Sequence, residues 1–168
     1  MDQTHIHLLI THLPVFGSIL GAIVLIQGIW TKSNHTIVAA YTVLIISAIG
    51  AVIAYLTGEA AEETVEHLQG ISENMIEQHE DFAVFALVSL IILGVAAVAG
   101  LFLALKKSTI TQAAAIVVLF ISLISFGLVA RTGYLGGLIR HTEISNAATS
   151  IQGQSEESEE NEESEDDD

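Results

Sequence analysis

The chain has 168 residues, a formal net charge of −15, a mean hydropathy of +0.60 and no cysteine. Ten of the twenty acidic residues lie between Glu156 and Asp168, so the other 155 residues carry ten acids against five bases. Such an apolar body with an acidic tail lacks the basic face that nucleic-acid binding needs. The absence of cysteine excludes disulfides, cysteine-ligated zinc, iron–sulfur clusters and c-type haem attachment.

Four long apolar runs predict four membrane-spanning helices. About 20 mostly apolar residues suffice to cross the hydrocarbon core. The four runs cover residues 8–30, 37–57, 82–105 and 110–130, and none contains Asp, Glu or Lys. We therefore expect an all-α polytopic membrane protein, with an antiparallel four-helix transmembrane bundle over residues 1–148. A disordered acidic tail is expected at residues 149–168.

The charges predict the orientation of this bundle. Lys32, Lys106 and Lys107 lie in two short loops on one side, and all twenty acids lie on the other. The positive-inside rule places the lysines in the cytoplasm. We expect a bacterial inner-membrane protein with both termini extracytoplasmic.

The outer ends of the helices are predicted to extend beyond the membrane. The stretch TGEAAEETVEHLQG predicts that the second helix continues past Thr57 to Gly70. A third helix is predicted to begin after Ser72, through ENMIEQHEDF, and to enter the third apolar run directly. The fourth helix is expected to continue to about His141.

Glycines at helical spacing mark two helices. Gly17 and Gly21 form one G-x-x-x-G pattern, with Gly28 one heptad further on, and Gly133 and Gly137 form another. In lipid this spacing indicates tight helix packing. The alternative is that the glycines leave room for a flat cofactor.

Six of the seven histidines fall at the outer helix ends: His5, His7, His12, His67, His79 and His141. Ionisable residues near the membrane in a bundle are candidates for function, and imidazole is a common ligand of haem iron. Haem b between helices needs two imidazoles at matching height. His7 or His12 with His79 meets that requirement, and His67 with His141 is a second, higher pair.

The first helix constrains this choice. His7 and His12 differ by about 140° around a straight helix, so both cannot face one ligand. Pro14 removes a backbone hydrogen bond and can kink this end of the helix.

The acidic residues offer a competing chemistry. Glu63 and His67 are i,i+4 neighbours on a glutamate-rich segment, which is close to the pattern of di-iron carboxylate bundles. A divalent metal would draw on this pair and on the remaining outer histidines, His7, His12, His79 and His141. A solvated acidic rim is the simpler interpretation of most of these glutamates.

Two arginines lie at the outer end of the fourth run. Arg131 stands where the apolar run ends, and a charge there should have a partner. The candidates are an acid from the 58–81 connection, a haem propionate or a lipid phosphate, and the alternative is an arginine that snorkels to the interface. Arg140 is a further candidate for cofactor binding.

The sequence also resembles a known family. HLLITHLPVFG at His7–Gly17 is similar to the H-P-x-x-x-H-F-P opening of small bacterial membrane proteins catalogued as domain of unknown function 2231, with Leu8 and Leu13 replacing the first proline and the aromatic. The resemblance covers residues 5 to about 144. It implies a four-helix fold and corresponding roles for His7, His12, His79, and for His141 after the G-Y-L-G-G stretch. It implies no agreed activity.

These patterns lead to an expected function. We expect a b-type cytochrome-like protein that carries haem b near the extracytoplasmic face and transfers electrons. Quinol and a basic extracytoplasmic redox protein are the expected partners, together with the lipid bilayer. The alternatives are a non-haem divalent-metal protein and a cofactor-free subunit of a membrane complex, as a homo- or hetero-oligomer. No phosphate-binding loop or hydrolase constellation is present.

Overall fold

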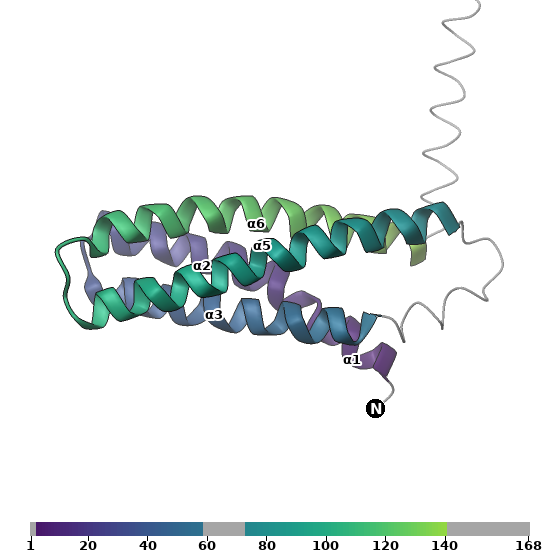
Figure 1. The fold of residues 1–168 in the computed structure, drawn as a ribbon, viewed down its shortest axis with the longest axis horizontal. Coiled ribbons are helices and arrows are strands. Elements are labelled where there is room, and N and C mark those ends of the chain that lie inside the picture. The colour runs from purple at the N-terminus through teal and green to yellow at the C-terminus, as the bar shows by residue number, and fades with distance from the viewer. Residues whose placement is uncertain (1–2, 59–72, 141–168) are drawn as a thin grey trace, which may run out of the picture.

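A computed structural model describes residues 3–58 and 73–140, and this part of the chain is helical, with no strand (Figure 1). The helices are α1 (Gln3–Ile10), α2 (His12–Trp30), α3 (Asn34–Leu56), α5 (Glu73–Leu105) and α6 (Thr111–Arg140). Four stretches are long and apolar enough to cross a membrane: His5–Trp30, Asn34–Leu56, Ile76–Leu105 and Thr111–Leu138. The prediction of four helices of membrane-spanning length is confirmed.

The first apolar run is divided between two helices. α1 ends at Ile10, and α2 begins at His12. Pro14 accounts for the break, because it has no N–H to offer the carbonyl of Ile10 and its ring crowds that carbonyl. Thr11 keeps helical angles (φ −60, ψ −25) and its N–H donates to the carbonyl of His7 at 3.0 Å, so the interruption is mild.

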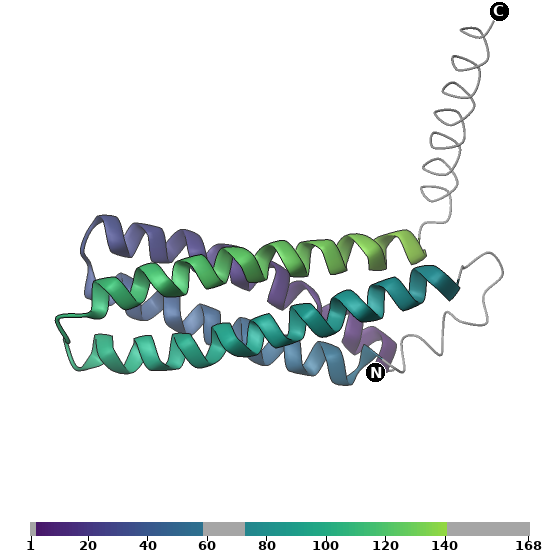
Figure 2. The ribbon, with the colours of Figure 1, turned by 45° about the horizontal axis from the view of Figure 1, so that its top comes forward.

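Two helical pairs make up the bundle. α2 packs on α3, α5 packs on α6, and further contacts join α3 to α5 and α2 to α6 (Figures 1 and 2). Short turns at one end of the bundle connect each pair. Each turn places a lysine in the left-handed region, Lys32 at φ 52 and Lys107 at φ 51, where glycine is more usual. Both turns, and the lysines that they carry, therefore lie at one end of the bundle.

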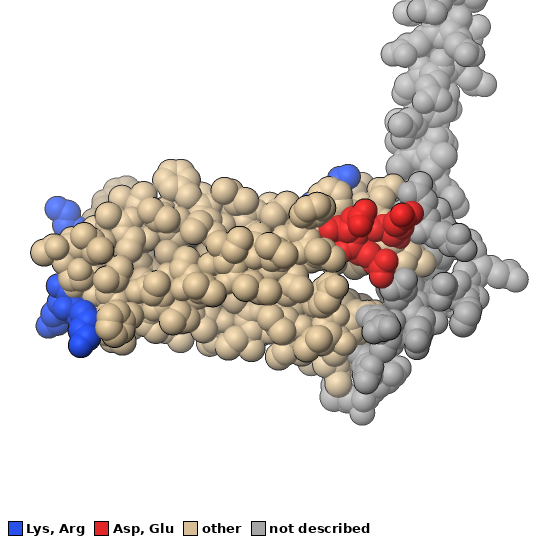
Figure 3. Space-filling model, viewed as in Figure 1, with Lys and Arg blue, Asp and Glu red and all other residues tan. Residues whose placement is uncertain are grey.

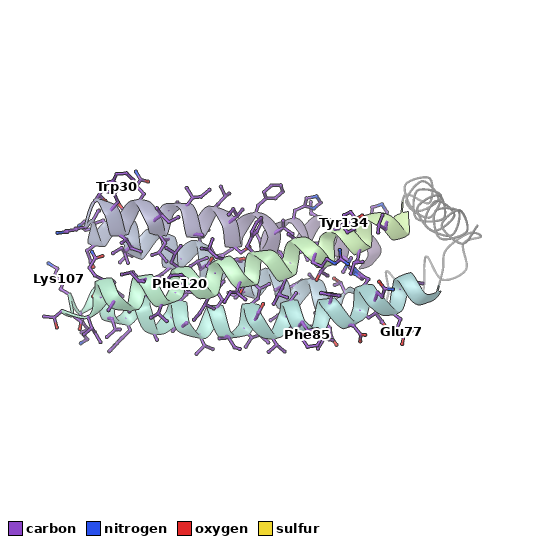
Figure 4. All side chains as sticks on the ribbon, turned by 90° about the horizontal axis from the view of Figure 1, so that it is seen from above. Trp30, Glu77, Phe85, Lys107, Phe120 and Tyr134 are labelled. Carbon is purple, nitrogen blue, oxygen red and sulfur yellow. The ribbon has the colours of Figure 1, made fainter. Side chains whose placement is uncertain are left out.

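The polarity of the bundle is inverted relative to a water-soluble protein. Buried serines join the helices: Ser47 donates to the carbonyl of Pro14 at 3.2 Å, and Ser122 donates to the carbonyl of Ser18 at 2.9 Å. The outward side chains along the same spans are apolar, among them Phe85 and Phe120, which are each 63% exposed and lie on the outside of the bundle (Figure 4). Apolar solvent around the helices fits this arrangement, since interhelical hydrogen bonds and small residues hold helices together in lipid.

The first glycine pattern packs as predicted. A Cβ at Gly28 would lie 2.9 Å from the backbone nitrogen of Ile37, and a Cβ at Gly17 would lie 2.7 Å from Cβ of Ser47. Gly21 faces the side chain of Leu44 in the same way. Gly17, Gly21 and Gly28 therefore form the close contact between α2 and α3.

The second glycine pattern does not pack within the described part of the chain. A Cβ added at Gly133 or at Gly137 would have no described atom of another element within 4 Å, so both glycines face outward from α6. Among the described residues, this pair therefore does not make the predicted helix contact. Gly136, between them, is the glycine of α6 that meets another helix.

The second helix is interrupted at Thr57, and Gly58, the last described residue before the gap, is helical again, so the predicted continuation to Gly70 lies outside the described residues. α3 ends at Leu56 with Thr57 as its cap, and the backbone N–H of Thr57 donates to the carbonyl of Ile53 at 3.1 Å. The carbonyl of Ala54 is instead bound by side chains, which explains the interruption. The expected turn at Gly70 and the acidic tail lie outside the described residues. α5 is already helical at Glu73, the first described residue after the gap, and α6 is still helical at Arg140, the last described residue.

Candidate haem or metal site at the outer helix ends

Charge separates the two ends of the bundle. Lys32, Lys106 and Lys107 are exposed at the end that carries the short turns, and Glu77 and Asp81 are exposed on α5 near the other end (Figure 3). The described histidines other than His35 lie toward the acidic end. We refer to this end as the outer end.

His79 projects from α5 against α6. Its Nδ1 lies 3.0 Å from the carbonyl oxygen of Thr132, and its side chain is half-buried. Gly136 makes this approach feasible, since a Cβ there would lie 3.1 Å from Cε1 of the His79 ring. The ring is thus held on one edge by the backbone of α6.

His7 occupies the corresponding position between α1 and α3. Its Nδ1 lies 2.8 Å from the carbonyl oxygen of Ala54 and 3.4 Å from the hydroxyl of Thr57. A Cβ at Gly58 would lie 3.6 Å from Cε1 of the His7 ring. That distance is an ordinary van der Waals contact, so the carbonyl of Ala54 is what positions this imidazole, as the carbonyl of Thr132 positions His79.

The hydrogen bonds define the tautomer of both rings. A carbonyl oxygen only accepts, so Nδ1 of His7 and Nδ1 of His79 must each carry the proton. Nε2 of each neutral ring then presents a lone pair, and no described residue hydrogen-bonds to either Nε2. Histidines that ligate a metal usually donate their other ring nitrogen in this way.

The two rings lie at matching heights. Ala54 is twenty residues from Asn34, the first residue of α3, and Thr132 is twenty-one residues from Thr111, the first residue of α6. At about 1.5 Å per residue, both carbonyls lie roughly 30 Å from the lysine end. Toward the outer end α5 diverges from α3 (Figures 1 and 2).

His12 is not brought to this pair. Its ring is exposed and stacks on Phe16 of the same helix, with centroids 6.3 Å apart. Its Nδ1 lies 2.9 Å from the carbonyl oxygen of Leu8, within its own chain segment. The sequence analysis left open whether His7 or His12 pairs with His79. Of these two, His7 is the one that faces another helix, α3.

Within the described part of the chain, the remaining histidines and candidate residues add no ligand to this pair. His5 is exposed on α1, and His35, which was not a candidate, is exposed at the lysine end of α3. Arg140 is the last residue of α6. The other three candidates, His67, Glu63 and His141, lie outside the described residues. Within the described ranges 3–58 and 73–140, no group of three His, Asp or Glu side chains could hold a metal ion.

Arg131 lies on the outward side of the α5–α6 contact. Its Cζ is 5.6 Å from the centroid of the Phe82 ring and 5.7 Å from that of the Tyr134 ring. The side chain is exposed, and no ion pair joins it to a carboxylate of the described part of the chain. It therefore does not point between the helices with His79, although Thr132 is its neighbour in sequence.

Three features of this site were not anticipated from the sequence: the carbonyls of Ala54 and Thr132, and the contact of Gly136 with His79. The G-Y-L-G-G stretch is the only sequence signal that could have pointed to one of them.

No family model, curated protein or solved structure matches this chain. The resemblance to the family of domain of unknown function 2231 therefore stays a prediction.

Proposed function

We propose that the protein is an antiparallel four-helix bundle in a bacterial inner membrane, with the lysine end in the cytoplasm and both termini outside. Four helices of membrane length, outward apolar side chains and buried interhelical serines support the membrane position. The separation of Lys32, Lys106 and Lys107 from the acidic end supports the orientation.

Within this bundle we propose that His7 and His79 hold haem b near the extracytoplasmic face. The observation that carries this proposal is the pair of imidazoles on different helices, each with Nδ1–H on a backbone carbonyl and with no hydrogen bond from Nε2 to a residue of the described ranges 3–58 and 73–140. This donor set fits haem b, because neutral imidazole nitrogen is a common protein ligand of haem iron, and His7 and His79 would supply two such ligands. Bound haem supplies a one-electron iron couple whose potential is set by its axial ligands and by burial.

The ligand count favours haem over a bare divalent ion. Two histidines satisfy the protein's share of a six-coordinate haem iron, whereas zinc and similar ions usually take three or four protein ligands. The described residues offer no third His, Asp or Glu beside the pair. A divalent-metal site and a cofactor-free structural subunit are the alternatives that the following measurement separates.

Electron transfer is the function that such a site would serve. Bound haem would supply one-electron chemistry for exchange with a membrane quinol. His7 and His79 would hold the iron through their Nε2 atoms. Exposed acids at the same end, among them Glu77, Glu80 and Asp81, would attract a basic extracytoplasmic acceptor.

Cofactor analysis of the purified protein tests the proposal. Protein extracted from bacterial membranes should give a pyridine haemochrome spectrum of haem b, with about one haem per chain for one bis-histidine site. Elemental analysis should find iron in the same amount and no stoichiometric zinc. Colourless protein that takes up no added haemin would contradict the proposal. A stoichiometric divalent metal without haem would then favour the metal-binding alternative.

A further inference from the structure

We propose that Arg131, Phe82 and Tyr134 form a binding site for the phosphate group of a zwitterionic phospholipid. This inference rests on the proposed membrane position of the helices and is independent of haem. The guanidinium lies near both aromatic rings, at 5.6 and 5.7 Å from their centroids. Phe82 comes from α5 and Tyr134 from α6, so the site joins two helices.

The height of Arg131 matches the membrane surface. Arg131 is twenty residues from Thr111, the first residue of α6. At about 1.5 Å per residue this is roughly 30 Å along the helix, which is about the thickness of the hydrocarbon core. A guanidinium at this depth lies level with phospholipid headgroups, and Tyr134 occupies the zone where aromatic residues are enriched (Figure 4).

The guanidinium is available for an anion. Arg131 is exposed, and among the described residues it contacts the faces of the two rings, which leaves its N–H groups without a carboxylate acceptor there. Arginine presents these donors in a planar fork that fits two phosphate oxygens. Contact with the two aromatic faces limits how far the side chain can move.

The surrounding charge selects the class of headgroup. Glu77, Glu80 and Asp81 are exposed at the outer end of α5 (Figure 3), and Arg131 contacts the ring of Phe82, the residue that follows Asp81. These carboxylates repel a lipid with net negative charge. A phosphate that is balanced by its own ammonium group, as in phosphatidylethanolamine, avoids this repulsion and can place its ammonium toward the acids.

Lipid retention measured by native mass spectrometry tests the site. The full-length protein in detergent is titrated with phosphatidylethanolamine or phosphatidylglycerol, and the bound lipid is counted for the wild type and for Arg131→Gln. We expect Arg131→Gln to lower retention of phosphatidylethanolamine about tenfold, the loss typical of a charge-assisted hydrogen bond. The double variant Phe82→Leu/Tyr134→Leu keeps the charge and should also lower retention.

Lys106→Gln provides the matched control. Lys106 also lies over one ring, with Nζ 5.6 Å from the Phe102 centroid, but at the opposite end of the bundle. This variant should retain lipid like the wild type, and an equal loss would overturn the assignment to Arg131. Preferential retention of phosphatidylglycerol would overturn the zwitterionic headgroup. Displacement of lipid by inorganic phosphate would indicate a free-phosphate site instead.

The haem content of Arg131→Gln separates this proposal from the proposed function. We expect this variant to bind as much haem as the wild type, because its side chain does not lie with His79. Loss of haem in Arg131→Gln would assign the guanidinium to a haem propionate and would overturn the lipid site. If Arg131→Gln retains less lipid but binds as much haem as the wild type, the result supports the lipid site. If the wild type binds no haem, the same loss of lipid in Arg131→Gln still supports the lipid site and leaves the haem proposal contradicted.

Discussion

Replacement of His79 by alanine should abolish stable haem binding. The ring of His79 supplies one of the two Nε2 ligands, and Gly136 and the Thr132 carbonyl hold it in place. Changes in outer-shell partners alone typically weaken metal binding 10–100-fold, so loss of the ligand should weaken haem binding by at least about 100-fold. The same loss is expected for His7→Ala. Titration of the purified apo-protein with haemin, followed through the Soret band, measures the effect.

Two other histidines provide controls for this experiment. His12→Ala should bind haem like the wild type, because the His12 ring stacks on Phe16 and does not face another helix. His35→Ala, at the lysine end, should also have no effect. Haem lost in His12→Ala and kept in His7→Ala would show that the wrong histidine of the first run has been assigned.

Replacement of Gly28 by alanine should destabilise the bundle strongly. The added Cβ would lie 2.9 Å from the backbone nitrogen of Ile37, and a backbone atom cannot move aside as a flexible side chain can. α2 and α3 must then separate, which costs about 1–3 kcal/mol by analogy with overpacked cores. Thermal unfolding in detergent, followed by circular dichroism, should show a clearly lowered midpoint.

Gly133→Ala is the matched control for the same change. No described atom of another element lies within 4 Å of a Cβ at this position, so the substitution meets no obstacle in the described part of the chain. The higher helix propensity of alanine should leave stability unchanged or raise it by up to about 1 kcal/mol. Equal destabilisation by both variants would mean that the loss at Gly28 reflects glycine as such and not the α2–α3 contact.

The sequence was sufficient to predict the four long helices and the close contact between α2 and α3. Long apolar runs predicted four membrane-length helices because lipid requires every backbone group to be bonded within a segment. The spacing of Gly17, Gly21 and Gly28 predicted a close contact because only small residues allow two helices to approach. The predicted contact at Gly133 and Gly137 is not made among the described residues, since spacing does not reveal which way a helix face points.

The candidate site could be predicted only in part. The sequence proposed His79 with either His7 or His12, and the choice depended on the local path of the chain around Pro14. The carbonyl acceptors at Ala54 and Thr132 come from other helices and leave no signal in the sequence. The end of α3 at Leu56 has the same origin, because side chains of His7 and Thr57 take the carbonyl that a longer helix would use.

The proposed function depends above all on His7 and His79 being the two axial ligands of one haem. Electron paramagnetic resonance of the ferric, haem-loaded wild-type protein examines this ligation itself, with near-infrared magnetic circular dichroism to identify the ligands. Ligation by these two histidines predicts a low-spin ferric signal with the charge-transfer band of a bis-imidazole haem. A high-spin signal, or a ligand pair other than two imidazoles, would contradict it.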